Sequence, residues 1–430
     1  MSGAIKVDNG KRGPGYSPVA VEDVMKANHV LKDVVTHTPL QKETWLSERY
    51  GCELYVKRED LQVVRSFKIR GAYHVIHQLA PEKLEQGVVC ASAGNHAQGV
   101  AYTCRKLGIH GRIYMPNPTP NQKIKQVKRF GGAAVEVVLV GDTFDDALTE
   151  ALAYSEAKGM EFIHPFENPA TIAGQGTVGL EILNDVPDPL DYLLVGIGGG
   201  GLAAGVASYV KALSPSTTII GVEPAGAPSM SRSVEAGKVI SLDSMDKFVD
   251  GASVQRVGEL NFQICRDMVD EFLLVPEGKV CTTILELYNE NAIVAEPAGV
   301  LPIAALDQLA ERIRGKNVAC ILSGGNNDIE RMPEIKERSL IYEGLKHYFT
   351  IQFPQRSGAL REFITDVLGP DDDIARFEYT KQNSKEHGPV LLGIELQRKE
   401  DYLPLLSRMK QKGYPFMEIN KDPTLFQLLI

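Results

Sequence analysis

The alternation of short apolar strands with helices between residues 87 and 322 constrains the fold of this chain more than any other feature. Six segments are rich in β-branched or other apolar residues, and most are followed by a segment with helical periodicity. Strands that alternate with helices in this way imply parallel sheets with helices on both faces. The sequence therefore predicts an α/β fold, with strands at residues 87–91, 112–115, 134–140, 191–197, 217–223 and 317–322. It also predicts mixed helix and loop at residues 224–290, a helix that opens at Glu296 and runs to about residue 313, and a helix capped by Asp142.

Three polar or glycine-rich loops directly follow strands of these predicted sheets. They are residues 92–95 (Ser-Ala-Gly-Asn), residues 198–201 (four glycines) and residues 323–326 (Ser-Gly-Gly-Asn). Ligands of open α/β sheets bind outside the carboxyl ends of the strands. We therefore expect the three loops to converge on one ligand site.

The four-glycine loop lies between a buried strand and a helix, and two ligands fit this context. A row of bare backbone amides at a positive helix end suits a phosphate group. The spacing Gly196-x-Gly198-x-x-Gly201, with Glu223 at the end of the next strand, also matches the dinucleotide fingerprint. However, a dinucleotide site there would leave the other two loops and a buried lysine without a role.

That lysine is Lys68, at the start of a predicted helix. Burial and the positive end of the helix dipole both favour a neutral amine, the form that acts as a base or forms a Schiff base. The alternative is that Lys68 reaches solvent or pairs with Glu59 or Asp60. The buried face that leads back to Lys68 consists of Ala72, Val75, Ile76 and Leu79.

The character of the chain changes near residue 331, and a separate module follows. The order of predicted elements after residue 346 is βαββαβ, a ferredoxin-like unit without a glycine-rich phosphate loop. We therefore predict four segments: a flexible arm (1–17), an α/β domain with a smaller subdomain at about 57–160 (18–335), a connector (336–345) and the α+β module (346–430).

The composition excludes several classes of protein. An apolar fraction of 43% and a charged fraction of 23% are typical of soluble globular proteins, and a net charge of -9 argues against a broad nucleic-acid surface. No run of about 18 apolar residues predicts a membrane span. The six cysteines contain no CxxC pair, so neither a zinc site nor a disulfide framework is expected, and a reducing cytoplasm is the predicted location.

Four motifs in this order resemble a known family. They are residues 66–72 (Ser-Phe-Lys-Ile-Arg-Gly-Ala), 92–96 (Ser-Ala-Gly-Asn-His), 198–202 and 323–326. The chain is similar to the pyridoxal-phosphate β-family of fold type II, and within it to the biosynthetic threonine dehydratases. The resemblance extends from about residue 20 to the C-terminus.

The resemblance implies that pyridoxal 5'-phosphate binds at these strand ends. Lys68 would form the Schiff base and then act as the base at the substrate Cα, and Phe67 would flank the cofactor. Asn95 would hydrogen-bond its 3-hydroxyl, and Ser323 would face its ring nitrogen. The phosphate would be held by Gly198, Gly199, Gly200, Gly201 and Leu202.

The resemblance also implies a substrate and a reaction. Ser92 and its loop would hold the substrate carboxylate, and L-threonine, or more weakly L-serine, would lose water and ammonia. The product from threonine would be 2-oxobutanoate, in the first step of isoleucine biosynthesis. Ala93 stands where serine racemases of the family have a second serine, and residues 224–233 contain no acid. Poor racemisation and no metal site are therefore expected.

The C-terminal module resembles a single ACT-like regulatory domain. The resemblance implies isoleucine as a feedback inhibitor, valine as an activator and a homotetrameric assembly. Residues 353–360 are a candidate part of the effector site, and a role in assembly alone is the alternative. Other functions weighed are a catabolic serine/threonine dehydratase, an NAD-dependent oxidoreductase using residues 191–223, and a non-catalytic amino-acid sensor.

Overall fold

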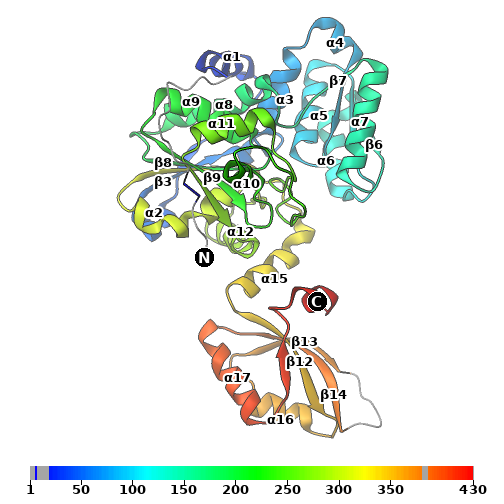
Figure 1. The fold of residues 1–430 in the computed structure, drawn as a ribbon, viewed down its shortest axis with the longest axis vertical. Coiled ribbons are helices and arrows are strands. Elements are labelled where there is room, and N and C mark those ends of the chain that lie inside the picture. Colours follow the sequence, from blue (N-terminus) through cyan, green and yellow to red (C-terminus); the bar gives the residue numbers. More distant parts are fainter. Residues whose placement is uncertain (1–4, 7–18, 380–385, 430) are drawn as a thin grey trace. The chain divides into compact units, whose positions relative to one another are not determined.

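A computed structural model describes residues 5–6, 19–379 and 386–429, which fall into two compact units, residues 1–329 and 330–430 (Figure 1). Most of the predicted flexible arm, residues 1–17, lies outside the described residues. Within the described residues, no helix is long and apolar enough to cross a membrane.

The first unit is built around a seven-stranded sheet in the order β1-β10-β9-β8-β11-β3-β2. The strands from β10 to β3 pair in parallel, and β1 and β2 add antiparallel edges. The strands are β1 (Ile5–Lys6), β2 (Leu40–Lys42), β3 (Glu53–Arg58), β8 (Tyr192–Gly196), β9 (Thr218–Pro224), β10 (Glu271–Val275) and β11 (Asn317–Leu322).

Helices cover both faces of this sheet. Helices α1 (Val21–Leu31), α8 (Pro169–Asp185), α9 (Gly201–Leu213) and α11 (Glu259–Met268) share one apolar core with it. The opposite face is covered by α13 (Leu301–Ala304), which packs on β8, β9 and β11. Helices α2 (Thr44–Tyr50), α10 (Ser229–Ala236), α12 (Glu277–Asn291) and α14 (Ala310–Ile313) complete the layer structure.

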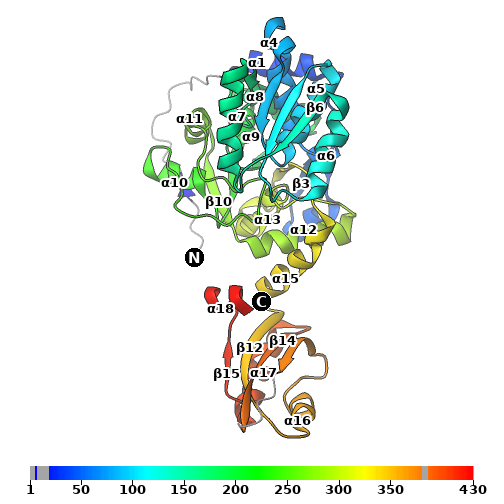
Figure 2. The same cartoon turned by 90° about the vertical axis from the view of Figure 1, so that its right-hand side faces the viewer.

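A second, four-stranded parallel sheet in the order β6-β5-β4-β7 forms the smaller part of this unit. Successive side chains of its strands face opposite sides. Helices α5 and α6 lie on one face of this sheet and α7 on the other (Figure 2). Val88 and Cys90 pack with α5 and α6, whereas Val89 and Ala91 pack with α7. The elements are α4 (Pro81–Gln86), β4 (Val88–Ala91), α5 (Asn95–Leu107), β5 (Gly111–Met115), α6 (Asn121–Gly131), β6 (Val135–Leu139), α7 (Phe144–Lys158) and β7 (Glu161–Phe162).

Helix α3 (Lys68–His77) joins the two sheets, because it packs against both α5 and α8. The contact with α8 is made by small residues. A Cβ added at Gly174 would lie 2.8 Å from the carbonyl oxygen of Arg70, and one at Gly71 would lie 2.4 Å from Gln175. The glycines therefore allow the backbones to approach closely and fix the helix that begins at Lys68.

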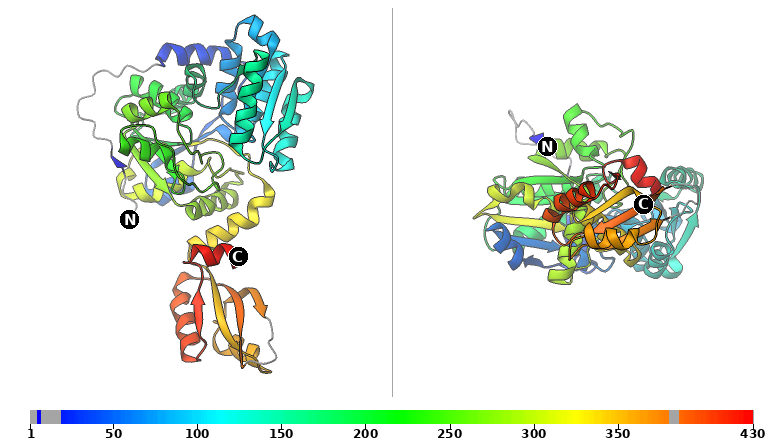
Figure 3. Two further views of the ribbon diagram at one scale, coloured as in Figure 1. Left: turned by 45° about the vertical axis from the view of Figure 1, so that its right-hand side comes forward. Right: turned by 90° about the horizontal axis from the view of Figure 1, so that it is seen from below.

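The second unit confirms the predicted βαββαβ order. Its antiparallel sheet has the strand order β13-β14-β12-β15, and α16 and α17 share its apolar core (Figure 3). Helix α15 (Met332–Tyr342) precedes it, and α18 (Pro423–Leu429), which was not expected, follows it. The elements between are β12 (Lys346–Pro354), α16 (Ala359–Asp366), β13 (Asp373–Tyr379), β14 (His387–Glu395), α17 (Tyr402–Gln411) and β15 (Phe416–Glu418).

The α/β prediction is confirmed, and three local expectations were wrong. Residues 224–290, expected to be helix and loop, contain the strand β10. The helix expected at 296–313 is broken into α13, a 3-10 turn and α14. The helix α7 is capped by Thr143 and not by Asp142, because Thr143 Oγ1 accepts from the Asp146 amide at 3.2 Å.

Candidate active site

One cavity lies at the carboxyl ends of β8 and β11, beside the start of α3. Its open volume is about 390 Å³, counting the space that is open to solvent. Two of the three strand-end loops, residues 198–201 and 323–326, contribute to its lining, and the loop 92–95 lies beside them because Asn95 contacts Asn326. The cavity also contacts residues that the sequence did not indicate. It is lined by Phe67, Lys68, Phe166, Gly196, Gly198, Gly199, Gly200, Gly201, Leu202, Gly251, Ala252, Ala298 and Ser323.

Residues 198–201 are glycines because one side of this loop packs closely against other chain segments. A Cβ on Gly199 would lie 2.3 Å from the Phe166 ring, and one on Gly198 would lie 2.9 Å from the Ala252 Cα. Gly200 has a φ of +90°, in the region that favours glycine. A row of amides without side chains at the start of α9 therefore forms a cradle that fits a phosphate group.

Asn261 of α11 holds this loop from behind and was missed by sequence reasoning. Its Nδ2 donates to the carbonyl oxygens of Gly199 at 2.7 Å and Phe166 at 3.2 Å. No local pattern around Asn261 or Phe166 signals this role, since both partners lie far away in the sequence.

Lys68 points its Nζ at the carbonyl oxygen of Pro165, to which it donates at 2.9 Å. Burial lowers the pKa of the amine to about 8, and the nearby Glu296 carboxylate opposes this shift. The alternative partners are engaged elsewhere: Glu59 pairs with Arg70 and Asp60 with Arg58. The interpretation of Lys68 as the partner of one of these acids was therefore wrong.

Ser323 is tied directly to the start of α3. Its carbonyl oxygen accepts from the Phe67 amide at 3.1 Å, and Gly324 forms a bridge with Ser66. The backbone of Arg65 adopts a φ of +58° in this turn. These contacts hold Lys68 and Ser323 in the same cavity although 255 residues, the difference between their two numbers, separate them.

Asn95 begins α5 and belongs to a chain of buried amide contacts next to the cavity. Its Nδ2 donates to Glu296 Oε1 at 2.6 Å, and its Oδ1 accepts from Asn326 Nδ2 at 2.7 Å. Burial raises the pKa of the Glu296 carboxyl to about 7. Sequence reasoning gave Glu296 only the role of opening a helix, although the adjoining Pro-Ala-Gly could have marked it.

Ser92 follows β4, in the same loop as Asn95. Its Oγ accepts from the Gly94 amide at 3.2 Å. In the part of the chain that the structure describes, Ser92 is not among the residues lining the cavity. The structure thus brings together Phe67, Lys68, residues 198–202 and Ser323, with the loop 92–95 joined to them through Glu296.

Glu223 does not have the environment of a ribose-binding acid. Its carboxylate is 1% exposed and accepts from the Met230 amide at 2.7 Å and the Ser231 amide at 2.8 Å. Both oxygens are therefore occupied by the N-terminal end of α10. This burial contradicts the dinucleotide interpretation of Gly196, Gly198, Gly201 and Glu223.

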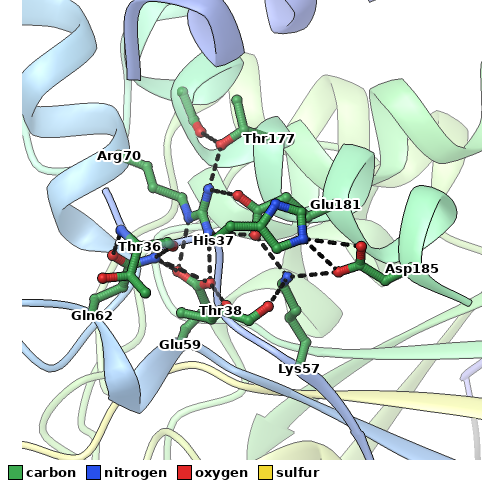
Figure 4. A network of polar contacts seen from close by, with 11 residues as sticks. Thr36, His37, Thr38, Lys57, Glu59, Gln62, Arg70, Thr177, Glu181 and Asp185 are labelled. Carbon is green, nitrogen blue, oxygen red and sulfur yellow. Dashed lines mark hydrogen bonds and ion pairs between the residues drawn. The ribbon is translucent and has the colours of Figure 1, made fainter. Parts of the chain in front are cut away.

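A cluster of buried charges behind α3 fixes the position of this helix (Figure 4). The Arg70 guanidinium donates to Glu59 Oε1 and Oε2 at 2.7 and 2.8 Å and to Glu181 Oε1 and Oε2 at the same two distances. Lys57 contacts Glu181 at 2.7 Å and the Thr38 carbonyl oxygen at 2.5 Å. Two bidentate contacts thus anchor the helix two residues after Lys68.

Comparison with known proteins identifies the class of enzyme. Residues 31–324 match the family of pyridoxal-phosphate dependent enzymes, and residues 337–429 match the C-terminal regulatory domain of threonine dehydratase. The glycine cradle, the partly buried Lys68 and the polar Ser323 in one cavity fit this cofactor.

Among curated relatives, the biosynthetic L-threonine dehydratase IlvA of Halalkalibacterium halodurans is 63% identical over 412 residues, covering 96% of this chain and 99% of that protein. The IlvA enzyme of Bacillus subtilis is 59% identical over 414 residues, covering 96% and 98%. The chain therefore belongs to the pyridoxal-phosphate dependent enzymes and, among them, to the threonine dehydratase family, which confirms the resemblance seen in the sequence.

Solved structures share the fold. The processed form of threonine deaminase isoform 2 from Solanum lycopersicum is 39% identical with a TM-score of 0.71, covering 77% of this chain and 99% of that chain. Maize serine racemase is 32% identical with a TM-score of 0.70, covering 76% and 99%. The described residues contain no group of three His, Cys, Asp or Glu side chains that could hold a metal ion.

Proposed function

We propose that this chain converts L-threonine into 2-oxobutanoate and ammonia, and L-serine more weakly, as the first step of isoleucine biosynthesis. The observation that carries the proposal is the partly buried Lys68 amine beside a glycine cradle, in a chain matched over 96% of its length by biosynthetic threonine dehydratases. The activity is tested by measuring the 2-oxo acid and ammonia formed from L-threonine by the purified chain with pyridoxal phosphate.

Bound pyridoxal phosphate supplies the electron sink that stabilises negative charge at the substrate Cα. Lys68 would carry the cofactor and would then take the Cα proton. With a pKa of about 8, about a fifth of the amine is neutral at about pH 7.4, and the neutral amine is the form that a general base requires. The amides of residues 198–202 would hold the phosphate, and the Asn95 side chain would contact the 3-hydroxyl. Phe67 flanks the cofactor ring, and Ser92 with its loop binds the substrate carboxylate.

Ser323 supplies a neutral partner for the ring nitrogen. A hydroxyl does not enforce a positive charge on that nitrogen, as an aspartate would. A cofactor whose ring nitrogen stays neutral would be a weaker electron sink, and this would favour loss of the β-hydroxyl over transamination. Ser323 thus helps to select the reaction, which is a proposal about specificity within the same site.

We further propose that residues 346–430 bind isoleucine as an inhibitor and valine as an activator. The match of residues 337–429 to the regulatory domain of threonine dehydratase supports an amino-acid ligand. Residues 353–360, which include the end of β12 and the turn before α16, are the proposed part of the effector site. Isoleucine inhibition of the full chain is compared with that of a chain ending at residue 339. Unchanged inhibition in the shortened chain would reject the regulatory assignment.

The chain is also proposed to act as a homotetramer in the cytoplasm, with a catalytic domain at residues 18–335. Family resemblance supports all three statements. Light scattering of the purified enzyme gives the assembly directly, and a mass other than four times the chain mass would reject the tetramer.

A further inference from the structure

Glu296 is a buried carboxylate next to the proposed cofactor site and has no role in the mechanism above. It is 6% exposed, and its backbone amide donates to the Gly324 carbonyl oxygen at 3.1 Å. A Cβ on Gly324 would lie 2.3 Å from Glu296 Oε1. The glycine after Ser323 therefore provides the room in which this carboxylate lies.

The contacts of Asn326 fix the orientation of the Asn95 amide. Asn326 Nδ2 donates to the Val64 carbonyl oxygen at 2.9 Å, and a backbone carbonyl can only accept. The second hydrogen of the same nitrogen goes to Asn95 Oδ1 at 2.7 Å. Asn95 therefore turns its oxygen to Asn326 and its nitrogen to Glu296, which accepts one of the two Nδ2 hydrogens.

We propose that Glu296 is a positioning residue, because it holds the Asn95 amide in the orientation that leaves one Nδ2 hydrogen for the 3-oxygen of pyridoxal phosphate. Its negative charge also favours a proton on the Lys68 nitrogen. The first statement rests on the proposed contact between Asn95 and the cofactor. A flipped Asn95 would turn its oxygen towards the Glu296 carboxylate, and two acceptors would then face each other.

The charges around Glu296 support the second statement. Lys68 of α3, Lys123 of α6 and Asp250 are the charged groups that act on this carboxyl or are acted on by it. Burial and Asp250 raise the pKa of Glu296, whereas the Asn95 hydrogen bond and Lys123 lower it. Lys68, which is a base, and Glu296, which is an acid, therefore both have pKa values close to neutrality, and they lie in the same part of the site.

The chain contains a matched control for this arrangement. Glu43 accepts from Asn291 Nδ2 at 2.7 Å, and the Asn291 Oδ1 accepts from Trp45 Nε1 at 2.5 Å. Glu43 is 2% exposed, and burial raises the pKa of its carboxyl as well. Neither pair lines the cavity itself, but the Glu296 amide donates to Gly324, the neighbour of the lining residue Ser323, whereas the Glu43 amide donates to Leu54 near the start of β3. The same Asn–Glu pair therefore occurs once at the proposed cofactor site and once outside it.

The experiment compares Glu296→Gln with Glu43→Gln in the full chain. The affinity of the apoenzyme for pyridoxal phosphate is measured by titration, and the visible absorption band of the holoenzyme is followed against pH. For Glu296→Gln we expect roughly tenfold weaker cofactor binding and a pH midpoint lower by about one unit, because a favourable charge is lost. Glu43→Gln should match the parent in both measurements, and equal behaviour of the two variants would overturn the proposal.

Two further variants separate the possible failures. Asn326→Ala removes the other contact that orients Asn95 and leaves the Glu296 charge in place. It should weaken cofactor binding without moving the pH midpoint, and a normal affinity would reject the positioning role even if Glu296→Gln does not fold. Asn95→Ala tests the underlying assignment: normal cofactor binding in this variant would reject the Asn95 contact itself. If Asn95→Ala binds the cofactor weakly while Glu296→Gln and Asn326→Ala bind it normally, only the positioning role of Glu296 is rejected.

Discussion

Helix α3 has a polar cluster on each side, and burial affects the charged groups of the two clusters in opposite ways. Lys68 and Arg70 are two residues apart, so about 200° of helix rotation separates their side chains. The Arg70 cluster consists of Arg70, Lys57, Glu59 and Glu181, and the Glu296 cluster consists of Lys68, Glu296, Asn95 and Asn326.

In the Arg70 cluster, ion pairs between the side chains compensate for burial. The carboxylates of Glu59 and Glu181 hold the pKa of the Arg70 guanidinium above its usual range despite its burial. The pKa of Glu181 is lowered, although burial acts in the other direction, because Arg70 and Lys57 stabilise its charge. Arg70 and Glu181 are therefore kept ionised, as suits a structural anchor.

In the Glu296 cluster, burial shifts the pKa of each ionisable group towards neutrality. The pKa of Lys68 falls to about 8 and that of Glu296 rises to about 7, because desolvation is the largest influence on each group. Groups with such shifts gain or lose protons readily at physiological pH, which is what chemistry at this site requires. The comparison indicates that the Arg70 cluster holds α3 in place, so that Lys68 in the Glu296 cluster can remain reactive.

The largest expected effect breaks the paired cluster. Arg70→Met leaves Glu59 and Glu181 buried without their guanidinium partner, so we expect a loss of about 3–5 kcal/mol in the free energy of unfolding. Urea denaturation measures this loss. Arg232→Met, which removes an exposed pair with Glu235, serves as the control and should cost about 0.5 kcal/mol. A loss below about 1 kcal/mol for Arg70→Met would contradict the anchoring role.

The next effect concerns the reactive cluster. Lys68→Ala should lower the rate of 2-oxobutanoate formation by about 10³-fold or more, since both the attachment of the cofactor and the base are removed. Its melting temperature without cofactor should remain at or above that of the parent chain, because a desolvated amine is lost. A variant that retains activity above a hundredth of the parent rate would reject Lys68 as the base.

Much of the site could be predicted from the sequence, because its signals are local. The register of the helix placed Lys68 on a buried face, and strands that run in parallel must end on the same side. The four glycines at 198–201 indicate that another group approaches the backbone closely, although the sequence does not say which group. These features depend on neighbours within a few residues, and the structure brings them together in one cavity.

The rest could not be predicted, because it depends on contacts between distant segments. The contact between Glu296 and Asn95 spans 201 residues, and that between Arg70 and Glu181 spans 111. Glu223 has the spacing of a ribose-binding acid, and only the packing of α10 shows that its oxygens are occupied. The strand β10 is a short apolar run, which periodicity does not distinguish from a buried helical segment.

The contrast between the clusters can be sharpened by the pH dependence of stability. The pKa of Lys68 is about 8 in the folded chain and 10.5 when unperturbed. Between these values the unfolded chain binds the additional proton, so the contribution of Lys68 to stability rises with pH. In the absence of cofactor, Lys68→Met should be more stable than the parent by about 2 kcal/mol below pH 8.

This advantage should disappear as the pH rises through about 10.5, where Lys68 is neutral in both states. Using the difference between the two chains cancels the tyrosines and other groups that titrate in the same range. Urea denaturation at a series of pH values measures it. An advantage that stays constant with pH would show that the Lys68 amine is not destabilised by burial.

The smallest expected effect comes from adding a carboxylate to the cavity lining next to the Glu296 cluster. Ser323 is 5% exposed and lines the cavity, so an aspartate in its place would put a carboxylate opposite the proposed position of the ring nitrogen. A stronger electron sink prolongs the life of the carbanion. We expect Ser323→Asp to form 2-oxobutanoate about tenfold more slowly and to convert part of the cofactor into pyridoxamine phosphate.

Ser323→Asn, which is similar in size but neutral, is the control. Absorption spectra recorded during turnover measure the amine form, and its absence in Ser323→Asp would mean that the charge opposite the ring nitrogen does not select between elimination and transamination.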